Sequence, residues 1–285
     1  MDNRIIELLF KTNAIQACPE GEPFFYTSGK IGPYYINTHY LYGSKNMADE
    51  YLYAIENFKK EIKSFSKNIF KLSYKQYISN EIYKDVIDMI CDKADEYDID
   101  YISGGERRDF FFSLLPASLL DKPHISILKD KTAIISTSDF NNSHIAKPDE
   151  LSGMKVLHIA DLVTEASSYE RAWIPALENL GLKFENSISV VDRNQGGREI
   201  LKEKNISLYA FASIDKQLFT KALKEKYISE RQYEMISLFI DDPDRFMLEF
   251  LDKNPEFLNE KINMGGKIKE RALLCKEMYL RNKEE

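Results

Sequence analysis

Cysteine and histidine are both scarce in this chain of 285 residues, which holds three cysteines and four histidines. Cys18, Cys91 and Cys275 lie far apart, and none belongs to a Cys-x-x-Cys pair. The histidines show no His-Glu-x-x-His or related ligand spacing. We therefore expect reduced thiols, no disulfide framework and no dedicated metal site on histidine.

Long apolar runs and blocks of one charge sign are missing as well. No stretch approaches the roughly 18 to 20 apolar residues of a membrane-spanning helix, and MDNRIIELLFKTNAI lacks the apolar segment and cleavage site of a secretory signal. The net charge is −7 and comes from interspersed acidic and basic residues, which disfavours duplex nucleic acid as a partner. The sequence predicts a cytoplasmic protein with neither a membrane nor a nucleic-acid partner.

The apolar fraction of 44%, with 12% aromatic residues, is typical of a folded globular chain. The length accommodates one catalytic core with additions. Residues 3–16 have helical spacing, and the aromatic segment FFYTSGKIGPYYINTHYLYG that follows predicts a strand and turn lid. Residues 48–97 have helical periodicity and almost no glycine or proline, which predicts two or three helices.

Short apolar runs alternate with helical segments from about residue 98 to residue 214, a pattern typical of parallel strands with right-handed crossovers. We predict an α/β fold with a central parallel sheet flanked by helices over residues 1–214. Within it, residues 1–43 form an N-terminal hood and residues 48–97 an enlarged helical segment. Residues 215–285 are charged and helical, and they form a C-terminal extension.

Hydroxyl side chains and an acid follow one predicted strand, in the run VLHIADLVTEASSYERA that begins at Val156. The strand leads to Asp161, and Thr164, Ser167 and Ser168 precede the next helix. Ligands of parallel sheets bind at the carboxyl ends of strands, where free N–H groups of a helix start can hold a phosphate. The run predicts a phosphate site, and the alternative is that the hydroxyls only cap the helix.

The same run resembles the phosphoribosyl-pyrophosphate-binding motif of type I phosphoribosyltransferases. In that family an apolar strand leads to two adjacent acids that hold the ribose hydroxyls, and a Thr-rich turn with Gly holds the 5-phosphate. Asp161 matches the second acid, whereas Ala160 replaces the first. Glu165 and Ala166 stand where a second Thr and the Gly are usual. The resemblance implies a type I phosphoribosyltransferase-like sheet and a phosphoribosyl-pyrophosphate site at Asp161, Thr164, Ser167 and Ser168.

A second segment, SVVDRNQGGREIL, resembles the orotate phosphoribosyltransferases, whose equivalent strand ends in Asp-Arg with a nearby Gly. In those members the arginine contacts the orotate base, so the resemblance assigns this contact to Arg193. A planar guanidinium suits the carboxylate and carbonyls of an anionic pyrimidine. The alternative is a surface pair of Asp192 with Arg193 in a turn.

The lid segment FFYTSGKIGPYYIN resembles the Ser-Gly-(Lys/Arg)-x-Ser-Pro-Tyr segment near the start of the same enzymes. The resemblance implies that Lys30, Tyr34 and Tyr35 lie at the orotate site, where the tyrosine rings can stack on the base. Gly32 replaces the usual Ser, and Thr27 stands where several members carry a lysine. The alternative is that the tyrosines are core residues of a hairpin.

Two further loops carry charges that suit a pyrophosphate. In IDYISGGERRDFF a Gly-Gly turn occupies the place of the family's pyrophosphate loop, which implies a pyrophosphate role for the following residues of this chain: Gly104, Gly105, Arg107 and Arg108. Glu106 and Asp109 can instead pair with the arginines as a closed ionic cluster.

The segment ISILKDKTAIISTSDFNNSHIAKPDE is similar to the family's mobile catalytic loop. Lys129 matches its first lysine, Leu128 replaces an arginine, and Lys131 or His144 can substitute for residues that are missing. A flexible polar loop is the alternative.

The chain is thus identified as a divergent member of the orotate phosphoribosyltransferase family, with the resemblance running in collinear order from about residue 5 to 214. It implies transfer of the phosphoribosyl group from phosphoribosyl pyrophosphate to orotate, giving orotidylate and pyrophosphate in pyrimidine biosynthesis. It also implies catalytic roles for Lys129, Lys131 and Asp161, Mg²⁺ bound through pyrophosphate and ribose oxygens, and a homodimer. Two alternatives stay open: a catalytically impaired sensor of nucleotides or phosphoribosyl pyrophosphate, and a transferase for another base.

Overall fold

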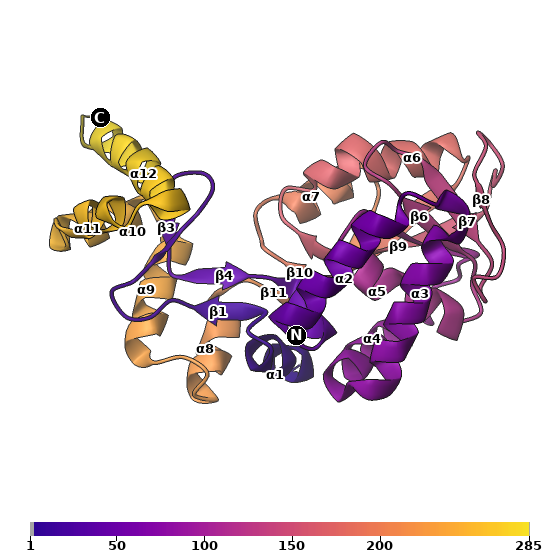
Figure 1. Cartoon of the computed structure of the whole chain (residues 1–285), viewed down its shortest axis with the longest axis horizontal. Coiled ribbons are helices and arrows are strands. Elements are labelled where there is room, and N and C mark those ends of the chain that lie inside the picture. The colour runs from indigo at the N-terminus through magenta and orange to yellow at the C-terminus, as the bar shows by residue number, and fades with distance from the viewer. Residues whose placement is uncertain (1–2, 285) are drawn as a thin grey trace. The chain divides into compact units, whose positions relative to one another are not determined.

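The structure is a computed structural model that describes residues 3–284 (Figure 1). The chain forms two compact units, and each consists of segments that are distant in sequence. One unit holds the chain up to Ala14 together with Thr38–Ile214. The other holds Ile15–Asn37 together with the chain from Asp215 onward. Residues 15–37 of the predicted hood therefore pack with the C-terminal extension, whereas the rest of the hood belongs to the larger unit.

The larger unit is built on a seven-stranded sheet, as counted over the described residues, with the order β11-β10-β9-β5-β6-β7-β8. Its first five strands in that order are parallel, and the last two are antiparallel. The strands are β5 Tyr101–Gly105, β6 His124–Ile127, β7 Ala133–Ser136, β8 Ser143–Ile145, β9 Lys155–Val163, β10 Lys183–Asp192 and β11 Ser207–Ser213. The predicted α/β class with a mainly parallel central sheet is confirmed.

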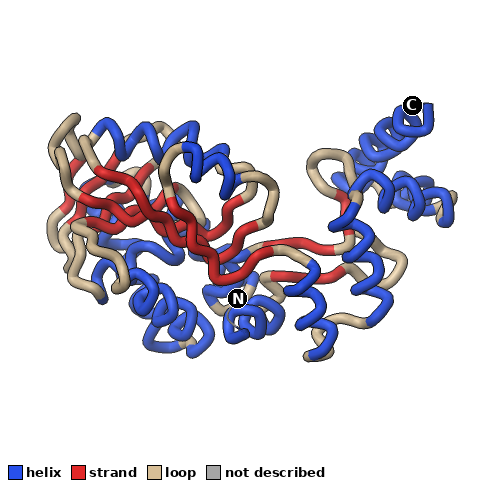
Figure 2. Tube along the Cα trace, turned by 180° about the vertical axis from the view of Figure 1, so that it is seen from behind, coloured by secondary structure: helices blue, strands red, loops and turns tan. Residues whose placement is uncertain are grey.

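Helices cover both faces of this sheet in Figure 2. They are α1 Asn3–Lys11, the 3-10 helix η1 Thr38–Tyr42, α2 Lys45–Phe58, α3 Ile62–Ser79, α4 Glu81–Ala94, α5 Phe110–Leu119, the π-helical turn η2 Tyr169–Trp173, α6 Ile174–Asn179 and α7 Gly197–Glu203. The predicted helices between 48 and 97 are thus α2, α3 and α4. Ser44 and Asn80 begin two of them by accepting backbone N–H groups of the first turn.

Helix α5 explains why the inserted helices are needed. Its sequence FFFSLLPASL is apolar on every side, and residues 110–117 are all buried. A helix that is apolar all round must be covered on all sides. The sheet covers one side, and α3 and α4 pack on α5 as well. The enlarged helical segment therefore encloses the helix that follows β5.

The smaller unit joins short strands to the C-terminal helices. Its elements are β1 Ile15–Ala17, β2 Phe24–Phe25, β3 Ile31–Gly32, β4 Tyr34–Ile36, α8 Lys216–Lys224, α9 Glu230–Asp241, α10 Pro243–Lys253, α11 Phe257–Asn263 and α12 Gly266–Glu284. Strands β2 and β3 form the predicted hairpin, and β1 pairs with β4. Aromatic contacts hold the strands on the helices, with Phe25 stacked on Phe257 and Tyr34 edge-on to Phe239.

Over the described residues, none of the helices combines the length and the apolar character that crossing a membrane requires.

Candidate active site

A cavity of about 290 Å³ opens at the carboxyl ends of the neighbouring strands β5 and β9. Two loops and the first turn after them supply its walls. The lining residues are Glu106, Arg107, Arg108, Asp109, Ala160, Asp161, Leu162, Val163, Thr164, Glu165, Ala166, Ser167, Ser168, Tyr169 and Trp173. Six of the predicted phosphoribosyl-pyrophosphate residues therefore meet in one place: Arg107, Arg108, Asp161, Thr164, Ser167 and Ser168.

The hydroxyls of the β9 loop are available to a ligand. Ser168 stands at the N-cap of η2 but makes no side-chain capping bond. None of the hydroxyls of Thr164, Ser167 and Ser168 hydrogen-bonds to another described residue. The alternative in which Ser168 serves as a helix cap is therefore wrong. Glu165 is exposed on the same loop, so a ligand phosphate would meet its negative charge.

The backbone of this loop is unusual at Ala166, whose φ of 51° lies in the left-handed region. A side chain there costs roughly 1 kcal/mol or more, which is why glycine is favoured at such positions. Beneath the loop, the N–H of Gly197 donates to the carbonyl of Thr164 over 2.9 Å. A Cβ at Gly197 would lie 2.5 Å from that oxygen, so only glycine fits. Gly197 is a supporting residue that the sequence analysis did not assign, although the Gly-Gly pair after β10 was a signal.

Asp161 is buried with 7% of its surface exposed. Its Oδ2 accepts a hydrogen bond from the Thr38 hydroxyl on η1, and its backbone N–H donates to Asp109 Oδ1 over 3.0 Å. Burial raises the pKa of Asp161, the negative charge of Asp109 raises it further, and the charge of Arg108 opposes both. Asp161 therefore holds its proton more readily than an exposed aspartate does.

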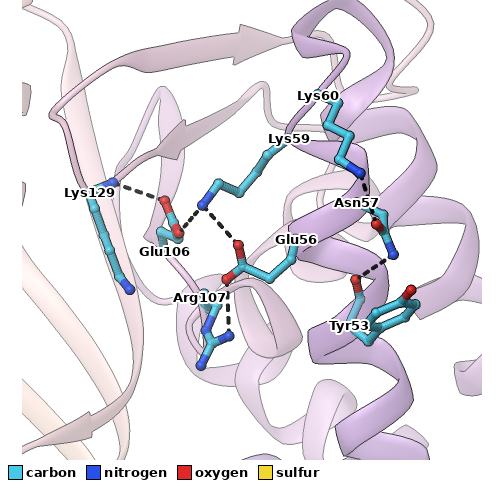
Figure 3. A network of polar contacts seen from close by, with 8 residues as sticks. All are labelled: Tyr53, Glu56, Asn57, Lys59, Lys60, Glu106, Arg107 and Lys129. Carbon is cyan, nitrogen blue, oxygen red and sulfur yellow. Dashed lines mark hydrogen bonds and ion pairs between the residues drawn. The ribbon is translucent and has the colours of Figure 1, made fainter.

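The loop after β5 is held by residues of the inserted helices (Figure 3). Glu106, joined to Arg107 by a cis peptide bond, accepts from Lys59 Nζ at 2.6 Å and from the backbone N–H of Lys129 at 3.0 Å. Arg107 Nη1 lies 3.0 Å from Glu56 Oε1. The sequence-based alternative, in which Glu106 and Asp109 neutralise the two arginines, is wrong.

The remaining residues of the predicted pyrophosphate loop have different surroundings. Arg108 forms no ion pair with a described residue, while its charge acts on Asp161. Gly104 and Gly105 lie outside the cavity lining, and a Cβ on either would meet Ser113 or Trp173 at under 2.3 Å. The two glycines permit close packing beneath the loop.

The segment matched to a mobile catalytic loop is a tight turn between β6 and β7. The N–H of Leu128 donates to Thr132 O, and the N–H of Lys131 donates to Leu128 O, each over 2.9 Å. Lys129 and Lys131 are exposed, and neither lines the cavity. His144 lies on the edge strand β8, where it contacts Glu150. Strands β7 and β8 occupy residues 133–136 and 143–145 of this segment, so the alternative of a flexible polar loop is wrong for those residues.

Arg193 follows β10, the strand next to β9. Its backbone N–H donates to Val163 O over 2.8 Å, and its Nε is buried without a hydrogen-bond partner. Asp192 pairs with Arg198 at 2.9 Å, so the alternative of an Asp192–Arg193 surface pair is wrong. Arg193 does not line the cavity that contains Asp161.

The three predicted hood residues belong to the smaller unit. Lys30 forms an ion pair with Asp244 at 2.7 Å. Tyr34 is 5% exposed and packs on Phe219 and Phe239, as expected of a hairpin core residue. The hydroxyl of the half-buried Tyr35 donates to the carbonyl of Phe25 over 2.6 Å.

Solved structures share this fold, although no protein-family model matches the chain. The UMP synthase of Leishmania donovani superimposes with a TM-score of 0.55 and 16% identity, over 83% of this chain and 41% of that one. The orotate phosphoribosyltransferase of Francisella tularensis superimposes with a TM-score of 0.50 and 14% identity, over 82% and 96%. The chain therefore has the type I phosphoribosyltransferase fold.

Sequence similarity points to one branch of that class. The orotate phosphoribosyltransferase of Caenorhabditis elegans is 26% identical over 150 residues, which are 52% of this chain and 63% of that protein. The enzyme of the same name from Staphylothermus marinus is 24% identical over 215 residues, 75% of this chain and 84% of that one. That of Synechocystis is 31% identical over 94 residues, 33% and 46%. The chain thus spans under two thirds of the length of two of these relatives, and its sequence is similar to those of orotate phosphoribosyltransferases at low identity.

Proposed function

We propose that this protein transfers the phosphoribosyl group of phosphoribosyl pyrophosphate to orotate, giving orotidylate and pyrophosphate. One observation carries the proposal: a single cavity gathers Asp161, the free hydroxyls of the β9 loop and the arginine-bearing β5 loop. In phosphoribosyl pyrophosphate, the 5-phosphate matches the hydroxyls, the ribose matches Asp161, and the pyrophosphate matches the arginines.

The 5-phosphate would bind the β9 loop, with Thr164, Ser167 and Ser168 donating hydroxyl hydrogen bonds beside the N–H groups of the following turn. Arg107 and Arg108 would hold the pyrophosphate, whose negative charge grows as the bond to the anomeric carbon breaks. Donors fixed in advance where charge develops stabilise the transition state more than the ground state. The site would therefore act mainly by positioning and by cationic stabilisation of the leaving group.

Mg²⁺ would neutralise pyrophosphate and ribose oxygens when bound, and the residues present fit such an ion. Asp161 offers a carboxylate in the cavity, which is the hard oxygen donor that Mg²⁺ prefers. Within residues 3–284, no group of three or more His, Cys, Asp or Glu side chains is arranged to hold a metal ion. We propose binding through the ligand's own oxygens with Asp161.

Arg193 is our proposed orotate contact. Lys30, Tyr34 and Tyr35 make their contacts within the smaller unit and are not part of this proposal. Support comes from the buried Nε of Arg193, which has no partner and gains one from an anionic base. We propose that Lys129 and Lys131 contribute to catalysis, and that the protein is a homodimer in which the β6–β7 turn of one subunit serves the site of its partner. Because both substrates are charged, we propose that the reaction takes place in the cytoplasm.

A second candidate function is a phosphoribosyl-pyrophosphate sensor with little or no turnover. It is favoured by Glu165 in the phosphate loop and by the tight turn at residues 128–131. An assay with phosphoribosyl pyrophosphate, Mg²⁺ and orotate, uracil or adenine separates the candidates. Loss of orotate absorbance that Asp161→Asn abolishes supports the transferase. Saturable binding of phosphoribosyl pyrophosphate with no product at high enzyme concentration supports the sensor, and turnover with only uracil or adenine redirects the base assignment.

A further inference from the structure

The acidic pair expected at the end of β9 is incomplete in the sequence. Ala160 stands beside Asp161, so the strand offers a ribose one carboxylate. Ala160 also lines the cavity, although its side chain is 1% exposed. Strand β9 therefore supplies no second polar side chain beside Asp161.

A second carboxylate reaches the same place from another element. Asp109, immediately before α5, lines the cavity and is 6% exposed. Its Oδ1 accepts the backbone N–H of Asp161 at 3.0 Å, and its Oδ2 accepts the N–H of Gly105 at 3.0 Å. These two bonds lock the carboxylate between β5 and β9, adjacent to Asp161. The pKa of Asp161 is raised by the charge of Asp109, which reflects the same proximity.

The position of Asp109 differs from what its place in the chain would predict. Aspartate at the start of a helix ordinarily accepts N–H groups of the first turn. Asp109 makes no such bond and turns toward the strand ends. No ion pair with Arg107 or Arg108 neutralises it, and the imidazole Nε2 of His158 lies 3.5 Å from its Oδ2. A carboxylate has about four acceptor sites, and only two are used, so acceptor capacity remains for a ligand.

We propose that Asp109 supplies the second carboxylate of this site, in place of the acid that Ala160 has lost, and that Asp109 and Asp161 together accept hydrogen bonds from the vicinal hydroxyls of a ribose 5-phosphate moiety. This inference rests on the proposed function. Two adjacent carboxylates match two adjacent hydroxyl donors, so the pair selects ribose over a sugar that lacks the 2-hydroxyl. Asp109 then contributes to sugar specificity, while the β9 loop holds the phosphate.

The test compares ribose 5-phosphate with 2-deoxyribose 5-phosphate by calorimetry on the full chain. A hydrogen bond to a charged acceptor corresponds to about tenfold in affinity or more. We expect the wild type to prefer ribose 5-phosphate by about that factor, and Asp109→Asn to reduce the preference toward unity. The affinity for inorganic phosphate should change less than twofold, which a general loss of structure would not allow. Asp92→Asn, at an exposed position of α4, is the matched control and should keep the full preference.

A second experiment places an acid at position 160 of strand β9. In the Asp109→Asn background, Ala160→Asp should restore the ribose preference. In the wild-type background, Ala160→Asp should add less than twofold, because the pair is already complete. This second measurement decides the case even when Asp109→Asn fails to fold: a large gain in the wild-type background overturns the inference. An undiminished preference in folded Asp109→Asn also overturns it. Failure of the wild type to bind phosphoribosyl pyrophosphate or ribose 5-phosphate overturns the proposed function instead.

Discussion

The adjacent glycines Gly196 and Gly197 after β10 give a matched pair of perturbations beside the loop after β9, which we propose binds phosphate. Gly197→Ala places a Cβ 2.5 Å from Thr164 O, 2.6 Å from Val163 Cγ1 and 3.0 Å from Ala166 N. Two of these three atoms are backbone atoms of the loop, so the loop must move. Gly196→Ala adds the same methyl group where no atom lies within 4 Å, although its φ of 90° also strains an alanine.

The magnitudes follow from these contacts. Overpacking of this kind costs about 1 to 3 kcal/mol, and weakening the bond from Gly197 N to Thr164 O adds about 1 kcal/mol. We expect Gly197→Ala to lower the free energy of unfolding by about 2 to 4 kcal/mol. Gly196→Ala should lower it by about 1 to 2 kcal/mol, the cost of a side chain in the left-handed region. A displaced loop also loses a charge-assisted bond to phosphate, which corresponds to roughly tenfold in Kd.

Urea unfolding and calorimetry with inorganic phosphate measure both effects. Gly197→Ala should lose stability and phosphate affinity together, whereas Gly196→Ala should lose stability alone. Equal phosphate affinity in the two variants would refute the assignment of the β9 loop as the phosphate site, because the methyl of Gly197→Ala cannot fit without moving it. A stable Gly197→Ala variant would refute the packing argument itself.

Three further outcomes are expected. Glu165→Thr should raise the affinity for inorganic phosphate severalfold, because it removes a negative charge from the loop. Titration calorimetry measures this affinity, and an unchanged affinity at low salt would contradict a phosphate site at this loop. Glu56→Gln should raise the affinity for pyrophosphate about two- to fivefold, because it frees Arg107 from a half-exposed ion pair that is worth about 1 kcal/mol at most. The control Glu50→Gln, on the same helix, should leave this affinity unchanged. Asp161→Asn should stabilise the protein at pH 8 by more than about 1 kcal/mol, because a raised pKa means that ionisation is costly in the native state.

The direction of the pKa shift of Asp161 determines the pH range over which Asp161→Asn changes the stability of the protein. A carboxyl whose pKa is higher in the folded protein contributes stability below its unfolded pKa of about 4, and that contribution is lost as the pH rises through the folded pKa. The advantage of Asp161→Asn over the wild type should therefore grow between pH 4 and pH 8, as followed by urea unfolding. A constant difference across that range would contradict the burial argument.

Local pattern was enough to predict the sheet and the loop after β9. The apolar run from Val156 can form a strand buried on both faces, and a polar turn after such a strand must lie at its carboxyl end. Asp161, Thr164, Ser167 and Ser168 could be named for that reason. The same reasoning predicted two or three helices between residues 48 and 97, because helical periodicity is a local property, and the structure has three.

The partners of these residues depended on contacts that no local pattern encodes. Thr38 reaches Asp161 across 123 positions of sequence, and Asp109 reaches it across 52. Glu56 meets Arg107 only because α2 packs beside the β5 loop. At Lys129 the structure differs from the predicted mobile loop. The pairing of β6 with β7 closes the residues between these strands into a tight turn, and the match to the family's loop did not predict this pairing.

By itself, the sequence determined the α/β class, the order of the strands along the chain and the polar residues of the loop after β9, since these follow from periodicity and turn chemistry within short segments. Only the tertiary structure decided which charges neutralise one another. It paired Arg107 with Glu56 and Lys59 with Glu106, and it set Asp109 beside Asp161 where the strand carries alanine. The physical reason is that hydrogen bonds and ion pairs form between atoms a few ångströms apart, and sequence separation does not determine that distance.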